Sequence, residues 1–456
     1  MNKIFSKFGI DVPLDNFDNL VEVTTNLQDG TLKHIVFYRL NNTDISQNLF
    51  RSRIENKEIG LLILNCEPSS KINIPYVVIN YDDFFNLQKE ICNQLYPKSF
   101  DVKLIGITGT NGKSTVVHLC HEILNKSGHK AFTIGTIGIC EGEKEILPAP
   151  GATTPSYVDL RRILHKLSSY EYACIEVSSH ALDQARLNGF ELEVSGFTNL
   201  SQDHLDYHGT MDKYLKAKLL IGDLSKKPLI VPHDEDDLVS MLTENNVDFE
   251  IAKKASVKSV NDSFSLSYNE KNLSLASLLA NRATNSVLEI PKDISLPKGR
   301  YNSFRYNKSL YVVDYAHTPD ALSNVVSETR RAFPKSHIIT IFGCGGDRDR
   351  LKRPRMLEAI LEISDEIVVT TDNPRTEDPQ SIIDDAVKGN IENPKVETIL
   401  DRKSAIKRYV RDYSDETIVI VAGKGHEEYQ DVNGVKHYFS DIEEIKAVIS
   451  EMRSES

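Results

Sequence analysis

The segment GITGTNGKST (106–115) carries residues in an order that could bind phosphate groups. It stands between an apolar run and an amphipathic segment that ends at Gly128. The apolar face of that segment consists of Val116, Leu119, Cys120, Ile123 and Leu124. N–H groups at a helix start cradle phosphate oxygens, so Lys113 would reach the β- and γ-phosphates and Ser114 would bind Mg²⁺. The glycine spacing is not the usual one, but the strand before and the helix after favour nucleotide binding over a plain turn.

Three further side chains could take part in metal chemistry, although their patterns leave the question open. Glu176 closes an apolar run, where a second strand of a phosphate-binding fold presents an acid to the metal, or where an acid is simply solvated. His204 lies beside Asp203, but Mg²⁺ prefers oxygen ligands, so the residue types alone favour a capping or core histidine over a metal ligand. Lys218 is half buried by pattern; such a lysine is paired, neutralised or snorkelling.

A third group of polar residues follows the apolar runs of the last third of the chain. These runs are SLYVVDYAH (309–317), HIITIFGCGG (337–346), EIVVTTDNP (366–374) and TIVIVAGKGH (417–426). Helical segments separate them, which predicts a βαβ series with a mostly parallel sheet. Because ligands bind at the carboxyl ends of such strands, we expect the polar clusters to form one site.

The elements that must position these residues form an α/β protein of three domains. We expect a small N-terminal α/β domain (1–98), a central phosphate-loop ATPase domain with a parallel sheet (99–297) and a C-terminal Rossmann-like domain (298–456). Polar joints separate them at 98–103 and 297–300.

Shorter runs predict the individual strands. In the first domain they are 34–40, 60–65 and 76–80, and in the second 174–179, 194–200 and 228–232. Residues 233–297 are weakly patterned and are expected to form a smaller part of the central domain. Ser440 and Glu443 predict a capping box at the last helix.

Composition bounds the class of protein. Apolar residues make up 40% of the 456 residues and charged residues 26%, which excludes a disordered or fibrous chain. The net charge of −12 argues against nucleic acid as a partner. We find no run of about 18 apolar residues, so we expect no membrane span. Because charges interrupt the first segment before a signal-peptide core could form, we expect a cytoplasmic protein. The six cysteines lack a CxxC pair and are expected to be reduced.

Ten motifs in order resemble those of the Mur ligases, ATP-dependent amide-forming enzymes of peptidoglycan precursor synthesis. They are TGTNGKST (108–115), TTP (153–155), EVSSHALDQAR (176–186), NLSQDHLDYHGT (199–210), YLKAK (214–218), GR (299–300), DYAHTPDAL (314–322), GCGGDRDRLKRP (343–354), DNPR (372–375) and AGKGHEEYQ (422–430). The most similar type adds the third residue of the stem peptide. The resemblance implies phosphorylation of the D-Glu carboxylate of UDP-MurNAc-L-Ala-D-Glu by ATP with Mg²⁺. The amine of an amino acid then attacks the acyl phosphate. We expect a monomer.

The resemblance also implies roles for single residues. Nucleotide contacts fall on Gly109, Thr110, Asn111, Gly112, Lys113, Ser114, Thr115, Asn272, Arg300 and Asp314. Magnesium would be held by Ser114, Glu176, His204 and a carbamylated Lys218, and the catalytic residues would be Lys113, Glu176, His204 and Lys218. The muramoyl-dipeptide contacts fall on Thr153, Thr154, Ser178, Gln184 and Arg186, although Thr153 and Thr154 could also be an ordinary turn before Pro155.

DNPR indicates which amino acid is added. The family members that add meso-diaminopimelate carry this motif, and those that add lysine generally lack its arginine. Diaminopimelate differs from lysine by a distal carboxylate, which Arg375 could bind through two parallel hydrogen bonds, with Asp372 and Asn373 taking the distal ammonium. Arg348, Gly423 and Glu427 match further contacts to this amino acid.

Alternatives differ in the acceptor or in catalysis itself. A folylpolyglutamate-synthetase-like ligase shares the phosphate loop and the lysine, but DNPR and the segment 176–186 speak against it. A lysine-adding variant is a further alternative. A non-catalytic nucleotide-binding regulator would have lost Lys113, Glu176 or Lys218, all of which are present. Residues 24–30 read TTNLQDG where the family carries an Asp-Ser-Arg signature, so no uridine contact is named.

Overall fold

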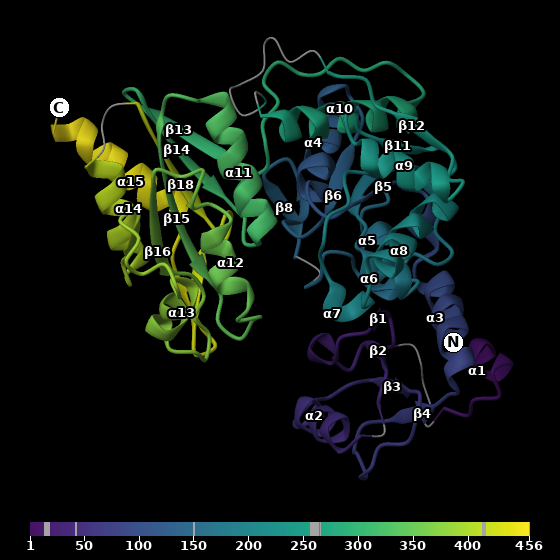
Figure 1. Cartoon of the computed structure of the whole chain (residues 1–456). Coiled ribbons are helices and arrows are strands. Elements are labelled where there is room, and N and C mark those ends of the chain that lie inside the picture. Colours follow the sequence, from purple (N-terminus) through teal and green to yellow (C-terminus); the bar gives the residue numbers. More distant parts are fainter. Residues whose placement is uncertain are drawn as a thin grey trace.

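The computed structural model describes residues 1–12, 19–41, 43–148, 151–255, 264, 266–412 and 416–455. Three sheets of four, eight and six strands, with one further two-stranded hairpin, organise these residues. Figure 1 shows three bodies, in which the central one touches both of the others. The predicted α/β class with parallel sheets is confirmed.

The N-terminal body is a four-stranded parallel sheet in the order β1-β2-β3-β4. Its strands are β1 (Glu22–Thr24), β2 (His34–Tyr38), β3 (Leu61–Leu64) and β4 (Tyr76–Val78), and its helices are α1 (Asn2–Lys7), α2 (Asp44–Ile54), α3 (Tyr81–Leu95) and the short 3-10 turns η1 (Leu27–Asp29) and η2 (Pro97–Phe100). Three of these strands confirm the three predicted ones. All four residues of β3 are buried, because the sheet is covered on both faces.

The central body is an eight-stranded sheet in the order β12-β11-β10-β5-β9-β6-β7-β8. The strands are β5 (Lys103–Thr108), β6 (Ala131–Gly135), β7 (Gly138–Glu141), β8 (Lys144–Leu147), β9 (Tyr172–Glu176), β10 (Leu192–Phe197), β11 (Leu229–Val231) and β12 (Phe249–Ile251). The helices are α4 (Lys113–Lys126), α5 (Tyr157–Lys166), α6 (Ser179–Asp183), α7 (Leu205–His208), α8 (Met211–Leu224), α9 (Asp236–Glu244) and α10 (Ser267–Thr284). Parallel neighbours flank β5 on both sides, so the segments that follow β5, β9 and β10 meet at one edge.

The weak pattern after residue 233 hides a long helix, α10. It packs against α4 and buries apolar positions such as Leu275 and Leu279. Polar side chains of the same helix, among them Asn269, Asn272 and Ser274, are buried as well. A helix buried on most of its faces lacks the regular polar stripe on which a sequence prediction depends. Residues 256–263, which precede it, lie outside the described residues.

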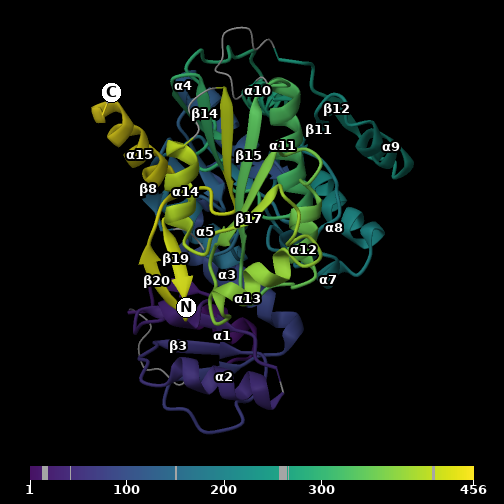
Figure 2. The ribbon, with the colours of Figure 1, turned by 60° about the vertical axis from the view of Figure 1, so that its left-hand side comes forward.

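The C-terminal body is a six-stranded sheet in the order β13-β14-β18-β15-β16-β17. The strands are β13 (Asn302–Tyr306), β14 (Ser309–Asp314), β15 (His337–Cys344), β16 (Glu366–Thr371), β17 (Val396–Thr398) and β18 (Thr417–Ala422), and β19 (Tyr429–Val432) pairs with β20 (Val435–Tyr438) as a hairpin. The helices are α11 (Pro319–Ala332), α12 (Lys352–Glu358), α13 (Pro379–Ala386), α14 (Arg402–Arg411) and α15 (Asp441–Glu455). Figure 2 shows the sheet between α14 and α15 on one side and α11 and α12 on the other.

The four predicted strands of the C-terminal series are confirmed as β14, β15, β16 and β18, all mutually parallel. Edge strand β13, which pairs antiparallel with β14, was not predicted. The capping box at α15 is half formed. The Ser440 hydroxyl accepts from the Glu443 N–H at 3.5 Å, while the Glu443 carboxylate accepts from the Tyr438 hydroxyl. Within the described residues, none of the helices is both long and apolar enough to cross a membrane.

Candidate active site

A phosphate loop joins β5 to α4 at the centre of the large sheet. Gly109 and Gly112 adopt φ of 140° and 83°, and a Cβ on Gly109 would lie 1.9 Å from Thr198 Oγ1. Within the described residues, α4 has no side-chain cap at its first turn and no acidic residue there. Its first N–H groups and the positive end of the helix dipole therefore fit an anionic group such as a phosphate.

The Lys113 ammonium lies inside this loop. Its Nζ donates to the carbonyl oxygens of Gly109 at 2.9 Å and Thr110 at 2.8 Å. Burial lowers the pKa of Lys113, while the carboxylates of Glu176 and Asp203 act in the opposite direction. The loop thus holds a cation at the place where the sequence predicts phosphate binding.

Lys218 reaches the same loop from α8 and is more deeply buried than its pattern indicated, with only 1% of its surface exposed. Its Nζ donates to the Gly109 carbonyl at 2.7 Å and lies 4.5 Å from the centre of the Tyr214 ring. Burial and the neighbouring charge of Lys113 hold the pKa of Lys218 well below its ordinary value. The snorkelling interpretation is therefore wrong.

Glu176 ends β9 as a buried acid, 2% exposed, so the solvated alternative is also wrong. Its carboxylate accepts hydrogen bonds from the N–H of Thr136 at 2.9 Å and from the Thr136 hydroxyl at 3.3 Å. A Cβ on Gly135 would lie 2.2 Å from Glu176 Oε1. Thr136 was not predicted, because a lone threonine after a glycine gives no chemical signal.

His204 begins α7 with a left-handed φ of 52° and stays partly exposed. Its Nε2 lies 3.4 Å from Asp203 Oδ2, and its ring centre lies 4.8 Å from that of His180. No cluster of three or more His, Cys, Asp or Glu side chains that could hold a metal occurs among the described residues. A magnesium ion takes few protein groups and several phosphate or water oxygens, so the hydroxyl of Ser114 and the carboxylate of Glu176 beside the loop still fit it.

Four of the five side chains predicted to bind the dipeptide form one hydrogen-bonded group, and the fifth, Thr153, bonds to Thr136 beside it. Thr154 Oγ1 donates to the Glu176 carbonyl at 2.8 Å and accepts from the Ser178 N–H at 2.9 Å. Arg186 donates to the Thr154 carbonyl at 2.7 Å and to the Gln184 side chain at 2.7 Å. Thr153 accepts from the Thr136 hydroxyl at 3.2 Å. This group therefore lies beside Glu176, at the end of β9.

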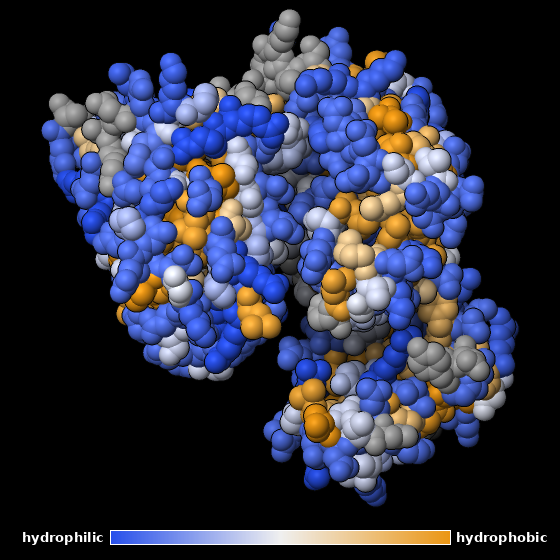
Figure 3. Space-filling view, in the orientation of Figure 1, coloured by the Kyte–Doolittle hydropathy of each residue, from blue (hydrophilic) through white to orange (hydrophobic). Residues whose placement is uncertain are grey.

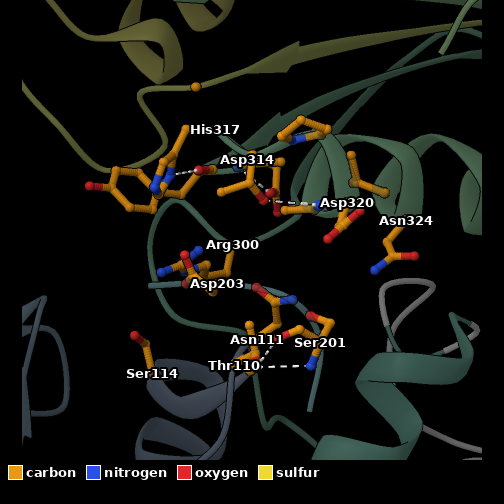
Figure 4. A pocket seen from close by; sticks show the side chains of 18 of the residues that line it. Thr110, Asn111, Ser114, Ser201, Asp203, Arg300, Asp314, His317, Asp320 and Asn324 are labelled. Carbon is orange, nitrogen blue, oxygen red and sulfur yellow. Dashed lines mark hydrogen bonds between the residues drawn. The ribbon is translucent and has the colours of Figure 1, made fainter. Parts of the chain in front are cut away.

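Arg300 and Asp314 face the phosphate loop from the C-terminal body. Asp314 accepts from the N–H groups of Tyr301 and Ala316, both at 2.8 Å, and burial raises its pKa. The Arg300 guanidinium stacks over the Tyr315 ring at 4.7 Å, and its buried Nε has no hydrogen-bond partner among the described residues. Figure 4 shows Thr110, Asn111 and Ser114 on one wall and Asp314, His317, Asp320 and Asn324 on the other.

The ends of β16 and β18 supply a second polar group. Asn373 donates to Glu427 Oε2 at 2.9 Å, and Arg375, at a left-handed φ of 50°, donates to the Gly346 carbonyl at 2.5 Å. Asp372 lies next to Gly423, whose Cβ would be 2.7 Å from Asp372 Oδ2. The backbone of Arg375 is clamped by the hairpin, since its N–H donates to the Asp431 carbonyl at 2.9 Å and its carbonyl accepts from the Asn433 N–H at 2.8 Å.

Two buried cations of this region were missed in the sequence. Lys424, 0% exposed, donates to Asn373 and Glu427 and stands inside the motif AGKGHEEYQ, which could have indicated it. Arg402 pairs with buried Asp441 and donates to the carbonyls of Thr371 at 3.3 Å and Ala422 at 3.0 Å. Arg402 thereby connects the strand ends that carry the second polar group, and no local sequence motif indicated this role.

One cleft of about 1690 Å³ joins both groups. Figure 3 shows the hollow between the central and C-terminal bodies. The predicted residues that line it are Thr110, Asn111, Gly112, Lys113, Ser114, Thr115, Thr153, Glu176, His204, Asn272, Arg300, Asp314, Arg348, Asp372, Asn373, Arg375, Gly423 and Glu427. The predicted residues outside that lining are Gly109, Thr154, Ser178, Gln184, Arg186 and Lys218.

A phosphate-loop body thus faces a Rossmann-like body across this cleft, and the comparisons identify the family. Residues 107–291 match the Mur ligase middle domain, and residues 299–425 match the Mur ligase glutamate ligase domain. The chain belongs to the Mur ligase family and is a ligase.

Relatives agree with this assignment. The UDP-N-acetylmuramoyl-L-alanyl-D-glutamate--2,6-diaminopimelate ligase of Aquifex aeolicus is 34% identical, over 91% of each chain. The ligase of the same name from Phocaeicola vulgatus is 34% identical over 86% of this chain and 88% of its own. A solved structure of that ligase superposes with a TM-score of 0.59 at 28% identity and 99% coverage of both chains. The folylpolyglutamate synthase of Mycobacterium tuberculosis, 16% identical with a TM-score of 0.56 over 74% of this chain and 91% of its own, shares the fold alone.

Proposed function

We propose that this ligase adds meso-diaminopimelate to the D-Glu carboxylate of UDP-MurNAc-L-Ala-D-Glu, with ATP converted to ADP and phosphate. The relatives at 34% identity carry the name of that reaction. The observation that supports it most strongly is the composition of the cleft, which has the phosphate loop on one wall and Arg375, Asp372 and Glu427 on the other. In the same proposal the enzyme is a cytoplasmic monomer whose partners are small molecules.

Chemistry explains why such a cleft needs both walls. A carboxylate is a poor electrophile, because its leaving group would be oxide. When its oxygen attacks the γ-phosphorus of ATP, ADP leaves and an acyl phosphate forms. The neutral amine of the amino acid then attacks the acyl carbon, the amide bond forms, phosphate leaves and a proton is released. Two anionic reactants must meet in the first step, so catalysis depends mainly on positioning and on offsetting charge.

The residues of the chain divide this work. In the proposal Lys113 and the first N–H groups of α4 hold the β- and γ-phosphates, and Arg300 and Asp314 fix the nucleotide from the other body. Magnesium held by Ser114 and Glu176, with His204 and carbamylated Lys218 at a second site, would neutralise phosphate charge. The group around Thr154 and Arg186 orients the dipeptide beside Glu176.

Arg375 decides between diaminopimelate and lysine in this proposal. A guanidinium binds a carboxylate through two parallel hydrogen bonds, and lysine would leave it unpaired in the cleft. Sites with unpaired polar groups reject the analogue by large factors.

The test is phosphate release by the full chain with ATP, Mg²⁺, UDP-MurNAc-L-Ala-D-Glu and a panel of amino acids. We expect release that depends on both the nucleotide sugar and diaminopimelate, with lysine far weaker. Release with glutamate and a folate acceptor, or none with diaminopimelate, would contradict the proposal.

A further inference from the structure

Lys424 is a fully buried cation between three side chains of the amino-acid wall. It follows β18, and its Nζ donates to Asn373 Oδ1 at 3.0 Å and to Glu427 Oε2 at 3.2 Å. Asp372 Oδ1 lies 4.0 Å away. The surface of Lys424 is 0% exposed, so water screens its interaction with these neighbours little. Its Nζ also lies 5.5 Å from the centre of the Tyr429 ring. A buried ammonium is costly unless it is paired, and here the pairs belong to the predicted substrate site.

The contacts of Asn373 fix which way its amide points. Its Oδ1 accepts from Lys424 and also from the Asp431 N–H at 3.0 Å, and both partners can only donate. Its Nδ2 donates to Glu427 Oε2 at 2.9 Å. A flipped amide would face two donors with its own N–H groups, so the observed orientation is the only one these contacts permit.

The acceptor capacity of Asn373 is therefore used up within the protein. A carbonyl oxygen has two lone pairs, and Lys424 and Asp431 occupy both, whereas one N–H of the amide remains to donate. Asn373 can then offer a hydrogen bond to a carboxylate, beside Arg375, but not accept one from an ammonium. This differs from the expectation drawn from DNPR alone, in which Asn373 shares the distal ammonium with Asp372.

The charges of this wall agree with one bound carboxylate and one bound ammonium. Asp372 and Glu427 contribute two negative charges and Lys424 one positive charge, which leaves one negative charge for one incoming ammonium. We propose that Lys424 is a positioning residue that fixes Asn373 as a donor, so that this wall accepts an amino acid end carrying one carboxylate and one ammonium on the same carbon. This inference rests on the proposed function and deepens it.

The test uses Lys424→Met, which keeps a side chain of similar length but removes the hydrogen-bond donor and the positive charge. Without Lys424 the Asn373 amide is held only by the Asp431 N–H and by Glu427, and the positive charge beside it is gone. We expect kcat/KM for diaminopimelate to fall by roughly tenfold or more, the effect of losing a charged hydrogen bond. The fall should lie mainly in KM for diaminopimelate, with KM for ATP unchanged. The ratio of kcat/KM for diaminopimelate to kcat/KM for lysine should also fall. A merely structural defect would lower the two kcat/KM values together and leave their ratio unchanged.

Two further variants make the outcome decisive. Lys403→Met is the matched control, because Lys403 is an exposed lysine of α14 paired with Glu444 at 2.9 Å; it should behave as wild type. Asn373→Asp keeps a partner for Lys424 but removes the Nδ2 donor, and should also lose diaminopimelate use even if Lys424→Met does not fold. A folded Lys424→Met or Asn373→Asp enzyme with the wild-type amino-acid ratio would overturn the inference. Wild-type enzyme inactive with diaminopimelate would instead overturn the proposed function.

Discussion

Lys113 and Lys218 donate to the same carbonyl oxygen, that of Gly109, from two different helices. Two ammonium groups that share one acceptor repel each other, and burial adds to the effect. The pKa of Lys218 is accordingly held well below its ordinary value, with burial as the larger cause and Lys113 as the second. A neutral amine is the form that attacks carbon dioxide; an N–C bond forms, a proton is lost, and an anionic carbamate replaces a cation. Carbamylation would turn the repulsion from Lys113 into attraction.

We expect Lys218 to react with labelled bicarbonate at a pH at which ordinary lysines, whose pKa is 10.5, remain protonated. Because the pKa of Lys218 is lowered, a larger fraction of its amine is neutral at a given pH than for an ordinary lysine. Labelling of Lys218 should therefore rise with pH and reach completion at a lower pH than labelling of other lysines. Carbon NMR of the ¹³C-labelled protein measures it. Lys218→Ala should lose most turnover, and small carbonate-like anions should restore part of it.

Lys216→Ala is the control for this variant, because Lys216 is an exposed neighbour on α8 that pairs with Asp212 at 2.9 Å. Its turnover and labelling should match the wild type. Full activity of Lys218→Ala would remove the carbamate role.

The Arg375 guanidinium can be tested separately from the nucleotide site. Arg375→Ala should raise KM for diaminopimelate by roughly a hundredfold, since a bidentate charged pair is lost, and should leave KM for ATP within about twofold. Initial-rate kinetics with each substrate varied in turn measure the split. Arg355→Ala, at an exposed arginine of α12 outside the cleft lining, serves for comparison. Equal losses for both substrates would count against amino-acid recognition by Arg375.

Gly109 is required by both its backbone conformation and its surroundings. Gly109→Ala places a Cβ against Thr198 Oγ1 at a φ of 140°, so we expect a loss of roughly 1–3 kcal/mol of unfolding free energy together with weaker nucleotide binding. Denaturant unfolding and calorimetric ADP titration measure these two effects. Gly128→Ala, beyond the other end of α4, has a φ of 89° but open space around it, and should cost about 1 kcal/mol without affecting ADP. Unchanged ADP binding in Gly109→Ala would speak against the loop as the phosphate site.

Local patterns predicted the parts of this protein that repeat a simple rule. The alternation of buried runs and helices predicted β14, β15, β16 and β18, and the glycines with Lys113 predicted the loop between β5 and α4. Helix α10 was not predicted, because buried Asn272 and Ser274 interrupt its apolar pattern. Strand β13 was not predicted, because its residues are only half buried.

In the candidate site, too, the residues within local motifs were predicted, and those that act through distant contacts were not. Residues inside long motifs, such as Glu176 and Arg375, were predicted and lie in the cleft lining. Arg402 and Thr136 act through contacts with segments far along the chain, so no window of sequence contains both partners. Lys424 stood within a recognised motif, but its role depends on Asn373, which is 51 residues away.

Glu377 links the loop after β15 to the DNPR loop and should make stability depend on pH. Its carboxylate accepts from Arg353 at 2.7 Å, from Arg350 at 2.8 Å and from the Asp347 N–H at 2.6 Å. The hydrogen bond from Arg353 is the largest cause that lowers the pKa of Glu377 to about 2 from 4.5. A carboxylate with a depressed pKa stabilises the fold above its unfolded pKa and loses that contribution as pH falls.

Glu377→Gln should therefore be less stable than the wild type at pH 7, and the difference should shrink as pH falls from about 4.5 toward 2. Denaturant midpoints across this range measure it. Glu244→Gln, at an exposed acid at the end of α9, is the matched control. A difference between Glu377→Gln and wild type that stays constant across the range would contradict the assigned pKa.

The two walls of the cleft should approach each other during turnover. Arg300 Nε is buried without a partner among the described residues, and the cleft of about 1690 Å³ separates the nucleotide wall from the amino-acid wall. Acyl phosphate and amine must come within bonding reach, and water must be excluded from a reactive intermediate, so closure is expected. Small-angle scattering should give a smaller radius of gyration with a nonhydrolysable ATP analogue and UDP-MurNAc-L-Ala-D-Glu than without ligands. Arg300→Ala should weaken this response, because the guanidinium would no longer join the phosphates from the opposite body. Identical profiles with and without ligands, in a protein shown to bind both, would mean that the cleft works in its open form.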